Sequence, residues 1–194
     1  MDAEFARNYQ TEIVLKNGGL LLIRSIRPDD KAALAEAFSQ LSKESIYSRF
    51  LSEKKELGPA ELVYLTELDF IHHVGLAAIL PESDPERIVG IARYIVINQE
   101  SENLLAEVAL LVVDQYQARG IGTALLKHLA RIAGKAGVSA FEAYVLWENA
   151  HIRELFEHCG YRIHSEIEDD LLKLFMDIDK SVFEDETPQA NAAL

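Results

Sequence analysis

One segment in the middle of the chain restricts the fold more than any other, because it has the pattern of a buried strand, a tight loop and the start of a helix. Residues 107–113 are mostly apolar, Asp114 to Arg119 are mostly polar, and Gly120 and Gly122 open an amphipathic stretch. The first turn of a helix carries N–H groups without intrahelical acceptors and the positive end of the helix dipole. Glycines let a phosphate approach such backbone closely. The segment therefore predicts an anion-binding site made of backbone groups and Arg119.

The glycine pattern narrows the kind of anion. A dinucleotide-binding fold uses Gly-x-Gly-x-x-Gly, and the run from Gly120 to Leu125 lacks the third glycine. Glu142 follows at the distance of a ribose-binding acid, but it lies in the middle of a predicted strand. No Gly-Lys-Ser/Thr sequence follows the loop, which excludes a Walker phosphate loop. The alternative to an anion site is a pair of glycines that only permit a tight turn.

The order of hydrophobic patterns along the chain predicts one α+β domain with helices on the faces of a mixed sheet. Alternating and β-branched runs indicate strands, whereas apolar residues spaced by three or four indicate helices. Residues 17–19 predict a hairpin turn, Asp29 is a predicted N-cap, and we expect Phe141 and Trp147 in the core. The predicted strands are 11–16, 20–26, 74–80, 88–97, 104–113, 138–147, 161–165 and 171–178, and the predicted helices start at Asp29 or cover 43–51, 59–68, 120–135 and 149–159.

The charge balance and the chain ends bear on the partners of the protein and on its cellular compartment. Its 194 residues include 32 acidic and 19 basic side chains, a formal net charge of −13. This charge opposes binding to nucleic acid or anionic membranes, and favours a cationic partner or simple solubility. The apolar runs are strand-sized, and Met1 to Gln10 lack the apolar core of a secretory signal, so we expect a cytoplasmic protein. We expect residues 1–10 to be an N-terminal tail, 11–183 a single domain, and 184–194 a flexible acidic tail.

The cysteine and histidine residues form no pattern of metal ligands. Cys159 is the only cysteine, which excludes an internal disulfide and a cysteine-based zinc site, and we expect it to be buried as a small hydrophobe. His72 and His73 are adjacent in a predicted strand, so they point to opposite faces. His151 and His158 have no clear third ligand. We therefore expect no metal.

Two motifs resemble those of the GNAT superfamily of acyl-CoA-dependent N-acetyltransferases. Residues 117–122, Gln-Ala-Arg-Gly-Ile-Gly, are similar to its Gln/Arg-x-x-Gly-x-Gly/Ala signature, which also lies between a strand and a helix. Residues 149–161 resemble the helix motif of the family that runs from Asn to Gly-Phe. The resemblance covers about residues 20–178 and implies a mixed, mostly antiparallel twisted sheet of about seven strands flanked by helices.

Within the superfamily, the chain resembles the bacterial protein lysine acetyltransferases. Residues 23–30, 41–50 and 107–112 each resemble runs that are typical of this subgroup. Some members carry a fused cyclic-nucleotide-binding or acyl-CoA-synthetase-like domain. We expect that 194 residues leave no room for either fused domain beside the acetyltransferase domain. Control by such a domain would then be absent or supplied by another protein.

The resemblance implies a site for acetyl-CoA as co-substrate. The backbone of Leu110, Leu111 and Val112 would pair with the pantetheine arm, and a main-chain N–H there would polarise the thioester carbonyl. Asn149 would cap the next helix and contact the coenzyme, and Phe156 would pack on the pantetheine or in the core. The signature loop would hold the pyrophosphate through main-chain amides, and its implied coenzyme-binding residues are Gln117, Ala118, Arg119, Gly120, Ile121, Gly122 and Thr123.

Glu107 matches the catalytic glutamate of the subgroup in position. Acyl transfer to an ammonium group needs a proton acceptor, because only the neutral amine attacks a thioester. Strand alternation puts Glu107 on one face with Ala109, Leu111 and Val113, where burial would raise the pKa of its carboxyl. The alternatives are a solvated glutamate at a strand end and a structural ion pair.

Many GNAT enzymes have a tyrosine that protonates the departing thiolate, and the corresponding position in this chain is Phe156. A coenzyme thiolate is a comparatively weak base and can leave without a positioned acid. Tyr144, Tyr161 and water remain candidates for the proton donor.

The sequence thus predicts an acetyl-CoA-dependent N-acetyltransferase in which Glu107 deprotonates a lysine of a protein substrate. We expect direct attack in a ternary complex, because no activated nucleophile is evident beside the loop. The alternatives are a small-amine N-acetyltransferase, a non-catalytic acyl-CoA-binding regulatory module, and a purely structural domain. A homodimer is compatible with the sequence.

Overall fold

A computed structural model describes residues 3–15, 18–81, 83, 85–98, 103–159, 162–168 and 171–178. The strands are β1 (Gln10–Val14), β2 (Leu20–Ser25), β3 (His73–Leu80), β4 (Arg87–Val96), β5 (Leu104–Val112), β6 (Val138–Leu146), β7 (Ile163–Glu168) and β8 (Leu171–Asp177). The helices are α1 (Ala3–Arg7), α2 (Lys31–Ser39), α3 (Lys43–Phe50), α4 (Pro59–Thr66), α5 (Ile121–Lys135) and α6 (Ala150–His158). Two short 3-10 helices cover Pro28–Asp30 and Asp114–Tyr116.

The strands form one mixed sheet in the order β1-β2-β3-β4-β5-β6-β8-β7. Neighbouring strands are antiparallel except β5 and β6, which are parallel. A parallel pair needs a crossover connection, and α5 supplies it. The structure therefore confirms the expected mixed, mostly antiparallel sheet of about seven strands, and it has eight.

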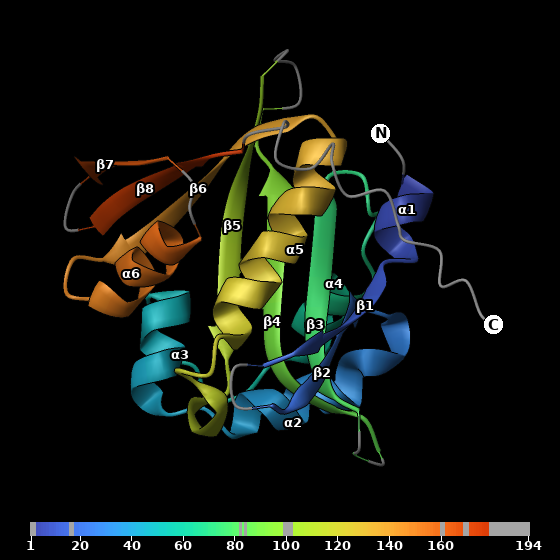
Figure 1. Ribbon diagram of the computed structural model, residues 1–194. Helices are drawn as coiled ribbons and strands as arrows, with labels where there is room; N and C mark the ends of the chain where they lie inside the picture. Colours follow the sequence, from blue (N-terminus) through green and yellow to red (C-terminus); the bar gives the residue numbers. More distant parts are fainter. Residues whose placement is uncertain are drawn as a thin grey trace.

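Helices cover both faces of this sheet. In Figure 1, α5 lies in front of β3, β4 and β5, and α4 lies behind them. A Cβ atom built on Gly90 of β4 would lie 3.1 Å from side-chain atoms of Ile121 and Leu125, which fixes α5 on the face of Gly90. The alternate residues Ile91 and Arg93 face the opposite side, where they share a pocket with residues of α2, α3 and α4. We call the α5 side the α5 face and the opposite side the α4 face. The two faces bury different side chains of the same strands.

The apolar stripe predicted for the crossover helix is buried as expected. Ile121, Leu125, Leu129 and Ile132 have exposed fractions of 0–1%, and Phe141 of β6 is fully buried. Cys159 is also buried, at 8% exposed, which confirms its expected role as a small hydrophobe.

Three local expectations are wrong. Residues 3–10, expected in a tail, form α1 and the first residue of β1, because Ala6 packs into the core and its carbonyl accepts a hydrogen bond from Ser25 Oγ (2.5 Å). Asp29 is not the N-cap, because a 3-10 turn precedes α2: Arg27 is the N-cap of that turn and Asp30 is the N-cap of α2. Trp147 is 56% exposed, since it follows the last residue of β6. The expected tail at 184–194 lies outside the described residues.

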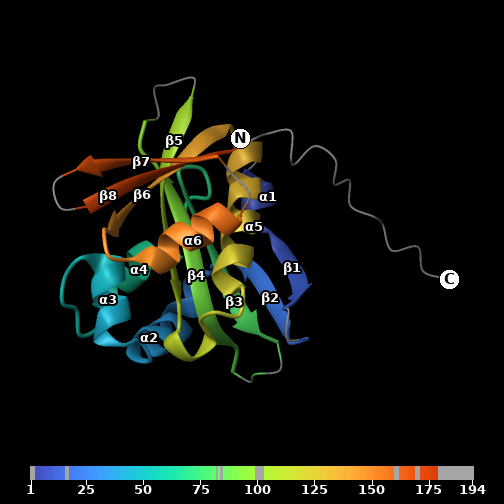
Figure 2. The ribbon, with the colours of Figure 1, turned by 60° about the vertical axis from the view of Figure 1, so that its left-hand side comes forward.

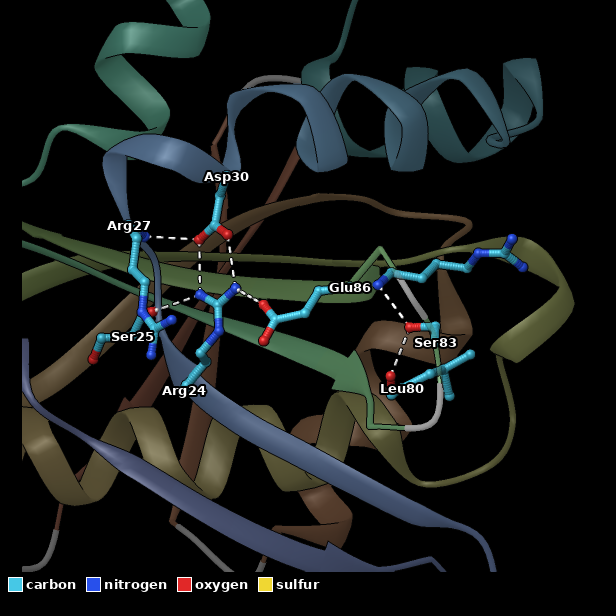
Figure 3. A network of polar contacts seen from close by, with 8 residues as sticks. Arg24, Ser25, Arg27, Asp30, Leu80, Ser83 and Glu86 are labelled. Atoms are coloured by element: carbon cyan, nitrogen blue, oxygen red, sulfur yellow. Dashed lines mark hydrogen bonds and ion pairs between the residues drawn. The ribbon is translucent and has the colours of Figure 1, made fainter.

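A buried arginine ties the N-terminal elements together (Figure 3). Arg24 of β2, 2% exposed, donates from Nη1 and Nη2 to the two carboxylate oxygens of Asp30, at 2.8 and 2.7 Å. It also donates to Glu86, at 2.5 Å, in the loop before β4. Burial disfavours the charge of Arg24, but the hydrogen bonds from Arg24 to Asp30 and Glu86 outweigh it and raise the pKa of the guanidinium. This network positions α2 against the sheet.

Candidate active site

The two parallel strands separate at the level of Glu107. The β5–β6 pairing runs from Leu104 opposite Val138 to Glu107 opposite Glu142, and no pair follows. Beyond this point β5 still pairs with β4, and β6 still pairs with β8. Figure 1 shows β6 diverging from β5 toward β7 and β8. The separation leaves a gap along one edge of β5.

The register decides which backbone groups of β5 face this gap. The N–H of Val113 donates to the carbonyl of Val89, and in the same register Ile91 and Leu111 form a hydrogen-bonded pair. The main-chain groups of Leu111 are therefore used by β4. Those of Leu110 and Val112 point the other way, and the Val112 carbonyl already accepts from Gln117 Nε2 at 3.0 Å. Of the three residues expected to pair with pantetheine, Leu110 and Val112 direct main-chain groups toward the gap, whereas those of Leu111 face β4.

The loop between β5 and α5 has the backbone geometry of an anion site. Ala118 and Gly120 both adopt the left-handed conformation, with φ of 57° and 85°. A non-glycine residue in this conformation is strained, and such strain tends to occur at functional sites. Gly120 is the N-cap of α5, so the N–H groups of Ile121, Gly122 and Thr123 begin the helix without intrahelical acceptors. Residues 117–120 are exposed, which leaves the loop open to a ligand.

The side chain of Arg119 lies along its own loop. Its Nη2 donates to the Gln115 carbonyl at 2.7 Å, and the guanidinium lies 5.3 Å from the centre of the Tyr116 ring. It thus adds positive charge beside the first turn of α5 while it closes the turn from Asp114 to Tyr116.

An aspartate that the sequence did not single out fastens this loop to α3. Asp114 accepts hydrogen bonds from the Ser42 N–H (2.7 Å) and Ser45 Oγ (2.5 Å), and Gln117 Nε2 donates to it at 3.2 Å. Partial burial acts to raise the pKa of Asp114, but the hydrogen bonds from Ser45 and Ser42 outweigh it and hold the pKa below its ordinary value. Ser42 is 72 residues away in sequence, so no local pattern could reveal the contact.

The lowered pKa of Asp114 predicts a pH-dependent contribution to stability. A group with a depressed folded-state pKa stabilises the fold above its unfolded pKa, about 4 for aspartate, and loses that contribution as the pH falls through the folded-state pKa. Asp114→Asn should therefore lower the free energy of unfolding by about 1–2 kcal/mol at pH 7. Urea denaturation from pH 7 down to pH 3 should show the wild-type and variant curves converging. Asp29→Asn, at an exposed position, is the control, and a difference that does not change with pH would contradict the assignment.

Glu107 lies where β5 and β6 begin to separate, with its side chain on the α4 face. It is opposite Ile95, two residues from Arg93 along β4. The side chain is exposed, so the expectation of a buried carboxylate is wrong: strand alternation fixes the face that Glu107 occupies but not whether another element covers it. Its charge acts on the guanidinium groups of Arg49 and Arg93, which the sequence reasoning did not link to it.

Helix α6 packs against the first turn of α5. A Cβ atom on Gly122 would lie 2.7 Å from Leu155 Cδ1, so this glycine allows α5 and α6 to pack closely. Asn149 caps α6, as expected, by accepting from the Ile152 N–H at 3.3 Å. Phe156 is 1% exposed and belongs to the core. Figure 2 shows α6 crossing in front of the sheet toward α5.

A second carboxylate lies beside Glu107. Glu142 of β6 is 4% exposed, and its Oε2 lies 3.1 Å from Lys173 Nζ of β8. Hydrogen bonds from Lys173 to Tyr144 and to Glu142 raise the pKa of the lysine. Tyr144 is thus engaged with Lys173, whereas Tyr161, another candidate acid, lies outside the described residues.

The described residues contain no group of three His, Cys, Asp or Glu side chains that could hold a metal ion. Within the same ranges, no helix has the length and apolar character that crossing a bilayer requires.

A strand edge with free main-chain groups suits an extended chain that carries amides, and the loop at its end suits a pyrophosphate. A coenzyme A thioester has both parts. The fold and this site define an acyltransferase that takes its acyl group from such a thioester.

Comparisons with known proteins give the family. Residues 43–161 match the Acetyltransferase (GNAT) family, and the chain belongs to it. It is 30% identical to Acetyltransferase PA5475 of Pseudomonas aeruginosa over 147 residues, which are 76% of this chain and 77% of that protein. It is 32% identical to Acetyltransferase Pat of Mycolicibacterium smegmatis over 149 residues, 76% of this chain but 43% of Pat. The chain thus spans less than half the length of that relative.

A solved structure supports the same assignment. The crystal structure of the GNAT domain of S. lividans PAT superposes with a TM-score of 0.80 and 33% identity, covering 87% of this chain and 96% of that domain. The resemblance read from the loop and helix motifs is therefore confirmed, and the protein is an acetyltransferase.

Proposed function

We propose that this acetyltransferase transfers the acetyl group of acetyl-CoA to the lysine side chain of a protein, in a ternary complex and by direct attack. The observation that carries the proposal is the position of Glu107, whose carboxylate lies at the inner end of the gap between β5 and β6. A thioester held along β5 and an amine that approaches over the α4 face would meet there. The likeness to Pat and to S. lividans PAT, with the subgroup motifs at 23–30, 41–50 and 107–112, favours a protein lysine as acceptor.

Glu107 acts as the general base in this proposal. A lysine ammonium must lose a proton before its nitrogen can attack the thioester carbonyl. The carboxylate takes that proton, directly or through water, and the neutral nitrogen then forms the new amide bond as the bond to sulfur breaks. The second proton that the nitrogen loses on becoming an amide passes to water or to the departing thiolate. Phe156 is buried and has no hydroxyl, so the coenzyme leaves as a thiolate without a tyrosine acid from α6.

The coenzyme is held by backbone in this proposal. Main-chain groups of Leu110 and Val112 pair with the pantetheine amides, and the N–H groups of residues 118–123 bind the pyrophosphate. Arg119 adds positive charge and Asn149 contacts the coenzyme while it caps α6. The proposal places no part of the coenzyme on Leu111 N–H or on the Phe156 ring.

Thiol release from acetyl-CoA tests the function. The purified chain is mixed with acyl-CoA synthetases and other lysine-bearing proteins, and in parallel with polyamines and free amino acids. We expect release with at least one protein acceptor, and acetyl-lysine in that acceptor by mass spectrometry. Release with small amines alone would reassign the substrate, and tight coenzyme binding without any release would indicate a regulatory module.

A further inference from the structure

Two arginines and a histidine gather on the α4 face near Glu107. Arg93 is in β4, opposite Gly75 and Ala109, and interrupts an otherwise apolar row between Ile91 and Ile95. Arg49 comes from α3, and it lines one pocket with Arg93 and with Ala109, Leu110 and Leu111 of β5. His73, at the start of β3, shares the face of Arg93. We call Arg49, His73 and Arg93 the cationic cluster.

The arginines of the cationic cluster have no carboxylate partner among the described residues. Within the described ranges, neither guanidinium has a carboxylate oxygen within 4.0 Å, in contrast to Arg24, which has two such partners. Arg93 Nη1 and His73 Nε2 are buried and have no hydrogen-bond partner there. Buried polar atoms are satisfied in most folded proteins, so the unpaired N–H group at Arg93 Nη1 points to a ligand that supplies an acceptor.

Electrostatics support an uncompensated positive charge at this point. Burial, and then the charge of Arg93, lower the pKa of Arg49 to about 10, while Glu107 partly opposes the shift. Burial also lowers the pKa of Arg93. The pKa of His73 falls to about 4 through burial and the charge of Arg93, so the imidazole is neutral at pH 7. The carboxylate of Glu107, which is exposed, is thus the negative charge that acts on both half-buried guanidinium groups.

Aromatic rings hold the cluster in place without using its hydrogen-bond donors. The Arg93 guanidinium lies 5.2 Å from the centre of the Tyr64 ring, and the His73 ring is 5.0 Å from the same ring. Arg49 lies 5.0 Å from the centre of the Phe50 ring. A planar guanidinium stacked on a ring keeps its N–H groups free in its own plane, where they can bind a carboxylate or phosphate.

We propose that the cationic cluster binds an anionic group of the acceptor, so that the preferred substrate is a lysine with an acidic residue close to it. The inference rests on the proposed function, since it takes the acceptor amine to approach over this face. A carboxylate held by Arg49 and Arg93 lies beside the strand that carries Glu107, which puts the attached amine within reach of the thioester. The protein as a whole carries a net charge of −13, so this local pair of arginines offsets the repulsion that an acidic acceptor would otherwise meet.

Matched peptides test the proposal. Each peptide carries one lysine with either glutamate or glutamine at the neighbouring positions, and a third version carries phosphoserine. We measure kcat/KM for acetylation, and peptide affinity by fluorescence anisotropy, for the wild type, Arg93→Gln and Arg87→Gln. Arg87 is an exposed arginine on the same strand and serves as the control.

The wild type should favour the glutamate peptide over the glutamine peptide by roughly 10- to 100-fold, the value of a charge-assisted hydrogen-bonded pair. Arg93→Gln should bring that ratio close to one, and Arg87→Gln should leave it unchanged. A larger preference for the phosphoserine peptide would identify phosphate as the favoured group. Thermal unfolding of Arg93→Gln shows whether the variant is folded, and Arg49→Gln repeats the test from α3.

Three outcomes would overturn the inference. If the wild type acetylates both peptides equally, the proposed function stands and the anion site falls. If no lysine is acetylated, the proposed function falls, and equal affinities for the two peptides would remove the anion site as well. If charge dependence appears only with the donor, as a preference for succinyl-CoA over acetyl-CoA that Arg93→Gln abolishes, the cluster binds the acyl group.

Discussion

Replacement of Glu107 by glutamine should lower the turnover of acetyl-CoA with a protein acceptor by at least about 100-fold, because general bases contribute about 100- to 10,000-fold to proton-transfer steps. Glutamine keeps the size of the side chain and removes its ability to take a proton. The coenzyme contacts come from the β5 backbone and the 117–123 loop, so binding of coenzyme A should persist. The checks are thiol release at saturating acetyl-CoA and calorimetric titration with coenzyme A.

The control for this variant is Glu12→Gln. Glu12 is an exposed glutamate on β1, the edge strand of the same sheet, and is far from the gap between β5 and β6 in strand order. Its replacement should leave turnover unchanged. Turnover within a few-fold of wild type for Glu107→Gln would mean that another group accepts the proton.

Asp30→Asn should destabilise the protein by about 3–5 kcal/mol, the effect of removing one partner from a buried ion pair. Arg24 is 2% exposed and Asp30 is 6% exposed, so water cannot solvate the guanidinium that loses its charged partner. Both carboxylate oxygens of Asp30 accept from Arg24, and one of them also accepts from the Arg27 N–H. An asparagine has only one acceptor oxygen, so it cannot make all three hydrogen bonds. Urea denaturation at pH 7 measures the change in the free energy of unfolding.

Glu86→Gln is the matched comparison, because it removes the other carboxylate from the same arginine. Glu86 is 51% exposed, and ion pairs at such positions contribute about 1 kcal/mol or less. The variant should therefore be close to wild type in stability. Equal losses for the two variants would mean that burial of Asp30 does not decide the strength of its ion pair.

The sequence predicted the elements that local patterns encode. The alternation of β3 to β5, the apolar stripe of α5 and the glycines at 120 and 122 each follow from residues close together in the chain. Backbone geometry at a helix start is also local, which is why the anion loop could be recognised before any fold was known. The family followed from the same loop and from the helix that begins at Asn149.

The ends of the elements depended on partners. Ala3–Arg7 forms a helix because Ala6 enters the core, and Trp147 is exposed because β6 ends one residue earlier. Neither the helix at the N-terminus nor the exposure of Trp147 follows from the local sequence, since each depends on which other elements pack against that segment.

The tertiary structure alone decided how the site is assembled. It separated β5 from β6 after Glu107, turned the Leu111 backbone toward β4, and tied Asp114 to residues 69 and 72 positions away. It also brought Arg49 of α3 against Arg93 of β4. A sequence pattern fixes which face of its own element a side chain occupies, because that depends on the helix or strand period. Which element covers that face depends on contacts between distant segments, and those form only when the chain folds.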